Sequence, residues 1–169
     1  SRLKSISIPS SVTAIGVGAF SNCDELTSVT IPSTVSSLGS HAFVDCDKLA
    51  TVELGVTTIN ASTFARCISL KSVTAVSLAE IGENAFSGCG ALEEFVFASS
   101  LKTIGNSAFQ ASGLKSIDFS ASESLDSIGA WAFAKCSALT TAVMNDNTSR
   151  IGEGAFFDNV ALVSFNMPL

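Results

Sequence analysis

The feature that most constrains this chain is a repeat that returns every 21 to 24 residues along the whole sequence. Its clearest mark is the dipeptide Ala-Phe, which Thr63-Phe64 replaces once. The phenylalanines of the seven units are Phe20, Phe43, Phe64, Phe86, Phe109, Phe133 and Phe156. A unit this short cannot bury its own apolar edge, so successive units are predicted to stack and share a continuous core.

Three further columns stay in phase with these phenylalanines. The first consists of leucines: Leu3, Leu26, Leu49, Leu70, Leu92, Leu114, Leu139 and Leu162. The second consists of aliphatic residues: Ile15, Leu38, Ile59, Ile81, Ile104, Ile128 and Ile151. The residue that follows the second column is Gly in six units and Asn60 in the third. A glycine column predicts a backbone position with positive φ, where Asn is the next most tolerant residue.

The segment after each leucine alternates in polarity, as in Val29-Thr30-Ile31. A period of two predicts one short strand per unit, with one face in the core and one facing outward. We expect strands at residues 6–8, 29–31, 52–54, 73–75, 95–97, 117–119, 142–144 and 165–167. Pro9, Pro32 and Pro168 follow such segments and should end their pairing.

The Ala-Phe-x-x-Cys stretch of each unit predicts a short helical or 3-10 turn on the side opposite the strands. These turns are bulkier than the strands. We therefore expect a curved stack of about eight rungs, with a parallel β-sheet on the concave face and the turns on the convex side.

The unit L-x-x-I-x-I-P-x-x-V-x-x-I-G-x-x-A-F-x-x-C resembles the BspA-like leucine-rich repeats of surface proteins from bacteria and some protozoa. The match covers the chain and is clearest over residues 26–46. Departures are local: the third unit lacks the Pro, Gly and Ala, residues 120–123 lengthen the sixth, and Ser112 and Asn159 replace Cys. The resemblance implies a leucine-rich-repeat solenoid with roles in adhesion and protein binding. We interpret residues 1–169 as one solenoid domain and expect it to be a fragment of a longer array or protein.

Charge and hydropathy exclude some partners. The net charge is -6, and only nine Lys and Arg residues are scattered along the chain, which argues against nucleic acid. No window approaches the ~18 uninterrupted apolar residues of a membrane span, so no membrane insertion is expected in this segment. The resemblance favours the cell surface or secretion. Unpaired thiols leave a reducing intracellular compartment open.

The five cysteines form a column three residues after the repeat phenylalanine: Cys23, Cys46, Cys67, Cys89 and Cys136. Stacked rungs would point their Cβ atoms in the same direction, whereas a disulfide needs them to converge. We expect buried, reduced thiols. No Cys or His pair has the spacing of a zinc site, so neither metal nor cofactor is predicted.

Residues for catalysis are sparse, and we expect no enzyme. His41, the single histidine, lies just before Ala42-Phe43 in a variable slot that we expect to be exposed and unconstrained. Glu94 and Asp118 are on neighbouring rungs, but a solvated sheet gives no reason for their pKa values to separate. In the same slot as His41, Trp131 could contact a partner or pack on the adjacent unit. Asn147 lies in an N-glycosylation triplet that matters only in a secretory pathway.

The outward strand positions are the predicted partner-binding face. They are Ser5, Ser7, Ser28, Thr30, Thr51, Glu53, Ser72, Thr74, Glu94, Val96, Ser116, Asp118, Thr141, Val143, Ser164 and Asn166. The leading hypothesis is a non-catalytic protein-interaction or adhesion module that presents this rigid surface to a protein. The alternative is a structural subunit that tiles into a larger assembly through its ends or convex loops, since core-type residues lie at both ends and need neighbouring repeats or subunits to cover them. A hydroxyl array that orders ice is disfavoured, because Glu53, Glu94 and Asp118 interrupt it.

Overall fold

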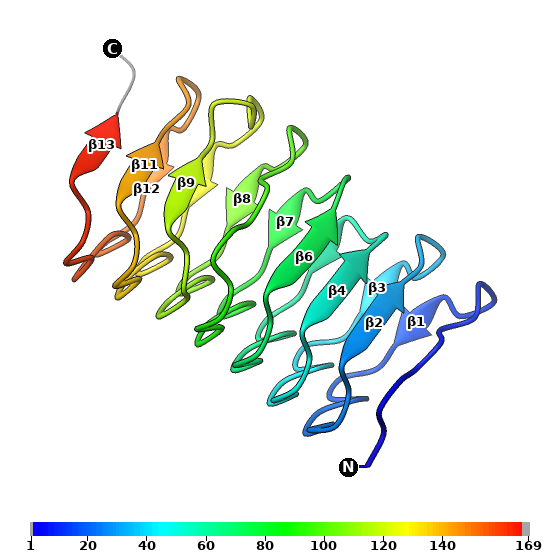
Figure 1. Ribbon diagram of the computed structural model, residues 1–169. Helices are drawn as coiled ribbons and strands as arrows, with labels where there is room; N and C mark the ends of the chain where they lie inside the picture. The colour runs from blue at the N-terminus through cyan, green and yellow to red at the C-terminus, as the bar shows by residue number, and fades with distance from the viewer. Residues whose placement is uncertain (1, 167–169) are drawn as a thin grey trace.

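Each repeat folds into one turn of a parallel β-solenoid. The computed structural model describes residues 2–166 and contains about seven such turns, with the two ends of the chain at opposite ends of the stack (Figure 1). Equivalent residues of consecutive turns pair in register, as Val29 pairs with Val52 and Val52 with Val73. Residues about one repeat apart therefore lie on top of one another, as the columns predict.

Six of the eight expected strands form. These long strands are β2 (Ser28–Ile31), β4 (Thr51–Leu54), β6 (Ser72–Ala75), β9 (Ser116–Asp118), β11 (Thr141–Val143) and β13 (Ser164–Asn166). They build two three-stranded sheets, β2-β4-β6 and β9-β11-β13. The strands expected at residues 6–8 and 95–97 do not form.

The long-strand sheet is interrupted where two phenylalanines occupy the inward positions of one rung. Phe95 and Phe97 are both buried, and their rings pack on Phe109 with centroid distances of 5.0 and 5.7 Å. The rung still fills the core, but its backbone is not part of a ladder.

A second set of strands, absent from the sequence expectations, covers another side of the solenoid (Figure 1). These short strands are β1 (Ala14–Ile15), β3 (Ser37–Leu38), β5 (Thr58–Ile59), β7 (Glu80–Ile81), β8 (Thr103–Ile104), β10 (Ser127–Ile128) and β12 (Arg150–Ile151). They form the sheets β1-β3 and β5-β7-β8-β10-β12, all parallel. Each carries the aliphatic column that precedes the glycine position.

The phenylalanine column forms a continuous stack through the core. Ring centroids of successive members lie 5.2 to 5.5 Å apart, from Phe20 on Phe43 to Phe133 on Phe156. The rings are nearly parallel, with interplanar angles between 6° and 16°. The leucine column from Leu26 to Leu139 is fully buried beside it. The predicted shared interior is confirmed.

The expected helical or 3-10 turns were wrong: the Ala-Phe-x-x stretch contains no helix. Alternate backbone N–H groups donate to the next rung instead, as Phe43 N does to Thr63 O at 2.9 Å. Residues two before and two after each phenylalanine have positive φ, for example +60° at His41 and +57° at Asp45. Because these N–H groups pair with the next rung and not within the turn, the turn extends a third ladder along the stack.

The expectation of positive φ in the glycine column was also wrong, since the positive values belong to the turn positions. Close approach of neighbouring rungs explains the glycines. A Cβ on Gly129 would lie 2.5 Å from the backbone nitrogen of Asn106, whereas a Cβ on Gly16, in the first turn, would meet nothing within 4 Å. Asn60 fits the column because its Nδ2 donates to Leu38 O at 2.6 Å.

The predicted effect of the prolines can be followed at Pro32 but not at Pro168. Pro32 directly follows β2, as predicted for a residue that ends strand pairing. Met167, Pro168 and Leu169 lie outside the described residues. Within residues 2–166 there is no helix of the length and apolar character that a membrane crossing requires.

Candidate functional site

Twelve of the sixteen predicted binding residues lie on the long strands, and Ser5, Ser7, Glu94 and Val96 lie on rungs where the expected strand does not form; we call this surface the long-strand face. Fourteen of the sixteen are exposed, and Thr141 and Val143 are half-buried. They align across rungs: Ser28 pairs with Thr51 and Thr51 with Ser72. The face is not one unbroken sheet, because the rung that carries Glu94 and Val96 forms no strand.

Few of these side chains have a structural task. Thr30 donates its hydroxyl to Glu53 Oε2 at 3.1 Å, which links adjacent rungs. Asp118 accepts a hydrogen bond from the backbone nitrogen of Ser120 at 2.8 Å. Hydrogen bonds from Ser120 hold the pKa of Asp118 below its ordinary value, so this carboxylate stays charged. A general acid would need the opposite shift.

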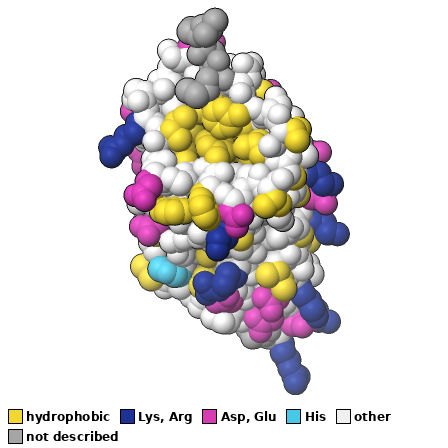
Figure 2. Space-filling view, turned by 90° about the vertical axis from the view of Figure 1, so that its left-hand side faces the viewer, with side chains coloured by type: hydrophobic (Ala, Val, Ile, Leu, Met, Phe, Trp, Pro, Cys, Tyr) yellow, Lys and Arg dark blue, Asp and Glu magenta, His cyan; other side chains and the backbone are white. Residues whose placement is uncertain are grey.

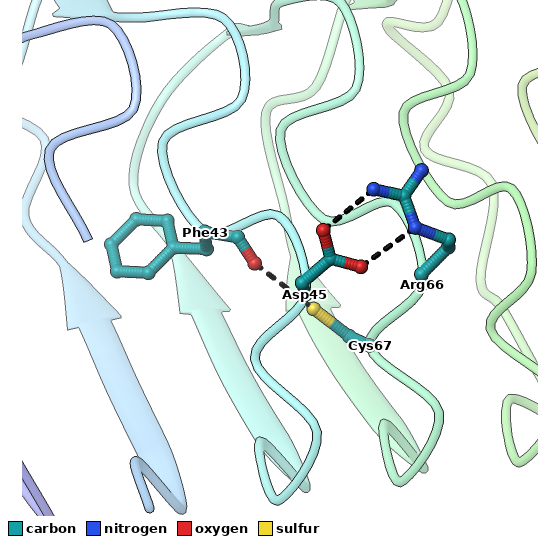
Figure 3. A network of polar contacts seen from close by, with 4 residues as sticks. All are labelled: Phe43, Asp45, Arg66 and Cys67. Carbon is teal, nitrogen blue, oxygen red and sulfur yellow. Dashed lines mark hydrogen bonds and ion pairs between the residues drawn. The ribbon is translucent and has the colours of Figure 1, made fainter. Parts of the chain in front are cut away.

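The five thiols are free and buried, as the column predicts. Cys67 Sγ donates to Phe43 O in the preceding rung at 3.2 Å (Figure 3), and Cys46 and Cys89 make the same contact with their own preceding rungs. Burial raises the pKa of Cys46 to about 11 and that of Cys89 to about 12. Protonated thiols are neither nucleophiles nor metal ligands. In the described part of the chain no group of three or more His, Cys, Asp or Glu could hold a metal ion.

Surface ion pairs connect adjacent rungs on the turn side. Arg66 donates from Nε and Nη2 to the two carboxylate oxygens of Asp45, both at 2.6 Å (Figure 3). The Arg66 hydrogen bond holds the pKa of Asp45 below its ordinary value. The arginine side chain is 61% exposed, so water screens the pair and its contribution to stability is small.

The slot of His41 is exposed in that unit but not unconstrained, because its backbone has positive φ in every turn. In the sixth unit Trp131 packs edge-on against Phe157 of the following rung, with ring centroids 5.4 Å apart. Its ring also covers Gly154, where an added Cβ would lie 2.6 Å from it. Packing on the adjacent unit, one of the two roles considered for Trp131, is confirmed.

A groove that the sequence reasoning missed lies over the short strands β5, β7, β8, β10 and β12. We call it the short-strand groove; its volume is about 830 Å³. Its floor follows the glycine column at Gly82, Gly105, Gly129 and Gly152. One wall is formed by Thr58, Glu80, Thr103, Ser127 and Arg150, and the other by Ala61, Glu83, Asn106, Ala130 and Glu153. A smaller hollow of about 430 Å³ adjoins it at Thr58 and Asn60.

A sequence signal for this groove did exist. The glycine column directly follows the inward aliphatic column, and a Cβ there would meet the backbone of the preceding rung. A row of four glycines on successive rungs removes side chains from this part of the surface and so indicates a trough. Two-residue strands are too short to be revealed by periodicity alone.

The end of the stack that carries the C-terminus exposes a hydrophobic patch (Figure 2). Phe157, Val160, Val163 and Phe165 are between 39% and 86% exposed. In each interior turn, alternate backbone N–H groups donate to carbonyls of the next rung. In the last rung, the equivalent N–H groups of Gly154, Phe156 and Asp158 have no acceptor within residues 2–166. At the other end, the equivalent carbonyls have no donor within that range, namely those of Val17, Ala19 and Ser21.

Comparison with known proteins identifies one family. The family described as a BspA type leucine rich repeat region matches residues 1–77 and 57–169, with six copies of the repeat. No curated protein matches this chain significantly.

Three crystal structures of bacterial proteins are similar. A leucine rich repeat protein of T. pallidum is 28% identical, with a TM-score of 0.85 over 96% of this chain and 79% of that one. A leucine rich cell surface protein of Faecalibacterium prausnitzii is 29% identical, with a TM-score of 0.68 over 94% of this chain and 52% of that one. A leucine-rich repeat protein of Eubacterium ventriosum is 26% identical, with a TM-score of 0.68 over 99% of this chain and 39% of that one. This chain thus spans about half or less of the latter two proteins.

Proposed function

The chain belongs to the BspA-type leucine-rich repeat family, and on that premise we propose that it is a non-catalytic protein-interaction and adhesion module whose contact surface is the long-strand face. The observation that carries this proposal is the alignment of exposed side chains on successive rungs, most of which the fold itself does not use. A rigid backbone with variable outward side chains is how solenoids present a surface to a protein partner.

The composition of the face sets the kind of binding. The sixteen positions carry mainly Ser and Thr, with no aromatic residue and no arginine to act as an energetic anchor. Individual contacts are therefore weak, and useful affinity comes from many copies of the module on one surface. The cell surface or the extracellular space suits such avidity, and the F. prausnitzii relative is described as a cell surface protein.

The test is adhesion of beads coated with this chain to a panel of immobilised extracellular proteins. The double variant Thr51→Arg with Ser72→Arg places two bulky cations at the centre of the β2-β4-β6 sheet and should abolish adhesion. Ser99→Arg, at an exposed position outside the face, is the matched control and should retain it. Full adhesion by the double variant would exclude the long-strand face as the contact surface.

A second candidate function is a structural subunit that assembles through its ends. The observation that favours it is that the two ends are complementary. The N–H donors of Gly154, Phe156 and Asp158 at one end and the carbonyl acceptors of the first turn at the other are the groups that pair between neighbouring rungs inside the stack. A second copy stacked end to end would continue that ladder and cover the hydrophobic patch. Because such a contact joins two different surfaces, it would form an open filament rather than a closed dimer.

Sedimentation velocity over a range of concentrations tests this assembly. The chain should form oligomers whose size increases with concentration. The variant Val163→Lys, which places a charge in the hydrophobic patch at the end of the stack, should be a monomer. Val76→Lys is the control, since Val76 is 80% exposed away from the ends. A monomer at every concentration would rule out assembly through the ends.

A further inference from the structure

We propose that the short-strand groove is a second binding site, separate from the long-strand face, and that it takes an extended, positively charged polypeptide segment. The site goes beyond the proposed adhesion function, because it lies over a different sheet and uses none of the sixteen long-strand residues.

The shape of the groove suits a chain-like ligand. It runs across five parallel strands, which are spaced about 4.8 Å apart and together give a length of roughly 19 Å. A fully extended segment of about six residues has this length. Over β7, β8, β10 and β12 the glycine floor lets a bound chain lie directly on the backbone of the solenoid, and at the β5 rung the row carries Asn60, whose Nδ2 donates to Leu38 O.

The floor cannot supply the recognition by itself. Its backbone groups are engaged in the ladder, as Gly105 N donates to Ile81 O and Gly129 N to Ile104 O, both at 2.7 Å. A ligand therefore cannot add a strand there and must be recognised by the side chains of the walls.

The walls are acidic. Among the lining residues, Glu80, Glu83 and Glu153 are three carboxylates against one cation, Arg150, a balance of -2. All four residues are exposed, and within residues 2–166 none forms an ion pair. The carboxylates of Glu25, Asp45 and Glu93 on the same solenoid are matched by a cation on the next rung. Glu83 accepts one long hydrogen bond from Asn84 Nδ2 at 3.4 Å, and no cation within residues 2–166 neutralises the three acids of the groove.

Other ligand classes fit less well. The lining contains no aromatic side chain on which a sugar ring could stack. The negative balance repels phosphate groups, which disfavours nucleic acid. A protein with a net charge of -6 also attracts cationic segments at long range. The combination of a straight trough, a bare floor and acidic walls favours a basic peptide.

The test uses the hexapeptide (Lys-Gly)3 titrated into the ¹⁵N-labelled chain and followed by NMR. We expect saturable shifts of the Gly82, Gly105 and Gly129 amide signals. Free lysine and (Glu-Gly)3 should produce none, since one cation cannot span the groove and an anionic peptide is repelled.

Charge variants then locate the site. Glu80→Gln and Glu83→Gln should each weaken binding by about two- to fivefold, the range of exposed charge pairs. Arg150→Gln should strengthen it by a similar factor, because it removes the one repelling cation. Glu53→Gln and Glu94→Gln make the same change of charge on the long-strand face and are the matched controls.

A neutral variant separates shape from charge. Thr103→Tyr places a large side chain in the wall without changing the charge, and it should weaken peptide binding while the far-UV circular dichroism spectrum remains unchanged. If Glu53→Gln and Glu94→Gln weaken peptide binding as much as Glu80→Gln and Glu83→Gln do, the peptide responds only to the overall charge of the protein, and the proposal is overturned. Unchanged binding with Arg150→Gln and Thr103→Tyr would overturn it as well. Neither outcome bears on the bead assay, so the two proposals can fail independently.

Discussion

The long-strand face and the side that carries the short-strand groove are built from the same repeat, and on both sides parallel strands of successive rungs pair in register. The long-strand face is covered by side chains, whereas the short-strand side is hollowed. On the long strands the outward positions carry residues such as Ser28 and Thr51. Directly after β7, β8, β10 and β12 the row is glycine, because its backbone approaches the preceding rung too closely for a Cβ. This row of residues without side chains forms the floor of a groove of about 830 Å³.

The two faces also differ in where their ladders are interrupted. The long-strand ladder stops at residues 95–97, whereas the short-strand sheet continues through that region from β7 to β8. The short-strand ladder stops between β3 and β5, where β2, β4 and β6 are continuous. The interruptions are staggered, so strand pairing on one face spans each gap on the other.

The largest expected effect concerns the core on which both faces rest. Phe86→Ala should destabilise the chain by about 3–5 kcal/mol, because it opens a cavity in the phenylalanine stack. Urea denaturation followed by circular dichroism measures this loss. A cost below about 1 kcal/mol would mean that the stack is not a shared core and that the two faces are independent.

The next effect tests why the short-strand side carries glycine where the long-strand face carries side chains. Gly129→Ala should cost about 1–3 kcal/mol, because the new methyl group meets backbone that cannot withdraw. Gly16→Ala occupies the same column in the first turn, where nothing lies within 4 Å, and should change stability by less than about 0.5 kcal/mol. Equal costs for the two variants, measured by urea denaturation, would contradict close approach as the reason for the glycine column.

A third effect tests whether the interior between the faces stays dry. Burial raises the pKa of Cys89 from 9.0 to about 12, so above about pH 9 the unfolded chain releases a proton that the folded chain keeps. The unfolded state then binds fewer protons, and stability falls as pH rises, by up to about 1.4 kcal/mol per pH unit from this thiol.

Cys89→Ser removes this titration and puts a hydroxyl in place of the thiol, as at Ser112, which occupies the same column. Denaturation at pH 8 and pH 10 should give a shallower decline for the variant than for the unmodified chain. Identical slopes would indicate that water reaches the thiol.

The smallest effect is expected on the outer surface of the long-strand side. Lys71→Ala removes an exposed side chain at the rim of β6 and should change the unfolding free energy by no more than about half a kcal/mol. The change can be measured in the same urea series as Phe86→Ala. Comparable losses from both would contradict the division into core columns and free outer positions.

The sequence predicted the features that depend on side-chain type at a fixed spacing. The Phe43 and Leu49 columns are buried, the thiols of Cys46 and Cys67 are free, and Ser28 and Thr30 face outward from a strand. It missed the short strands, because Glu80–Ile81 is too short to show a period. The predicted helical or 3-10 turns were wrong, because the three-residue spacing of Phe and Cys does not reveal that the N–H groups of the turn pair with the next rung.

What the sequence determined alone was the stack: equal spacing of apolar columns leaves only one arrangement in which every unit buries its edge against a neighbour. What the tertiary structure decided was the backbone of each turn and the location of the hollow. The N–H groups of each turn pair with the next rung, and the backbone of the glycine row approaches the preceding rung too closely for a Cβ. Those contacts arise between residues a whole repeat apart, and no local pattern of residues encodes them.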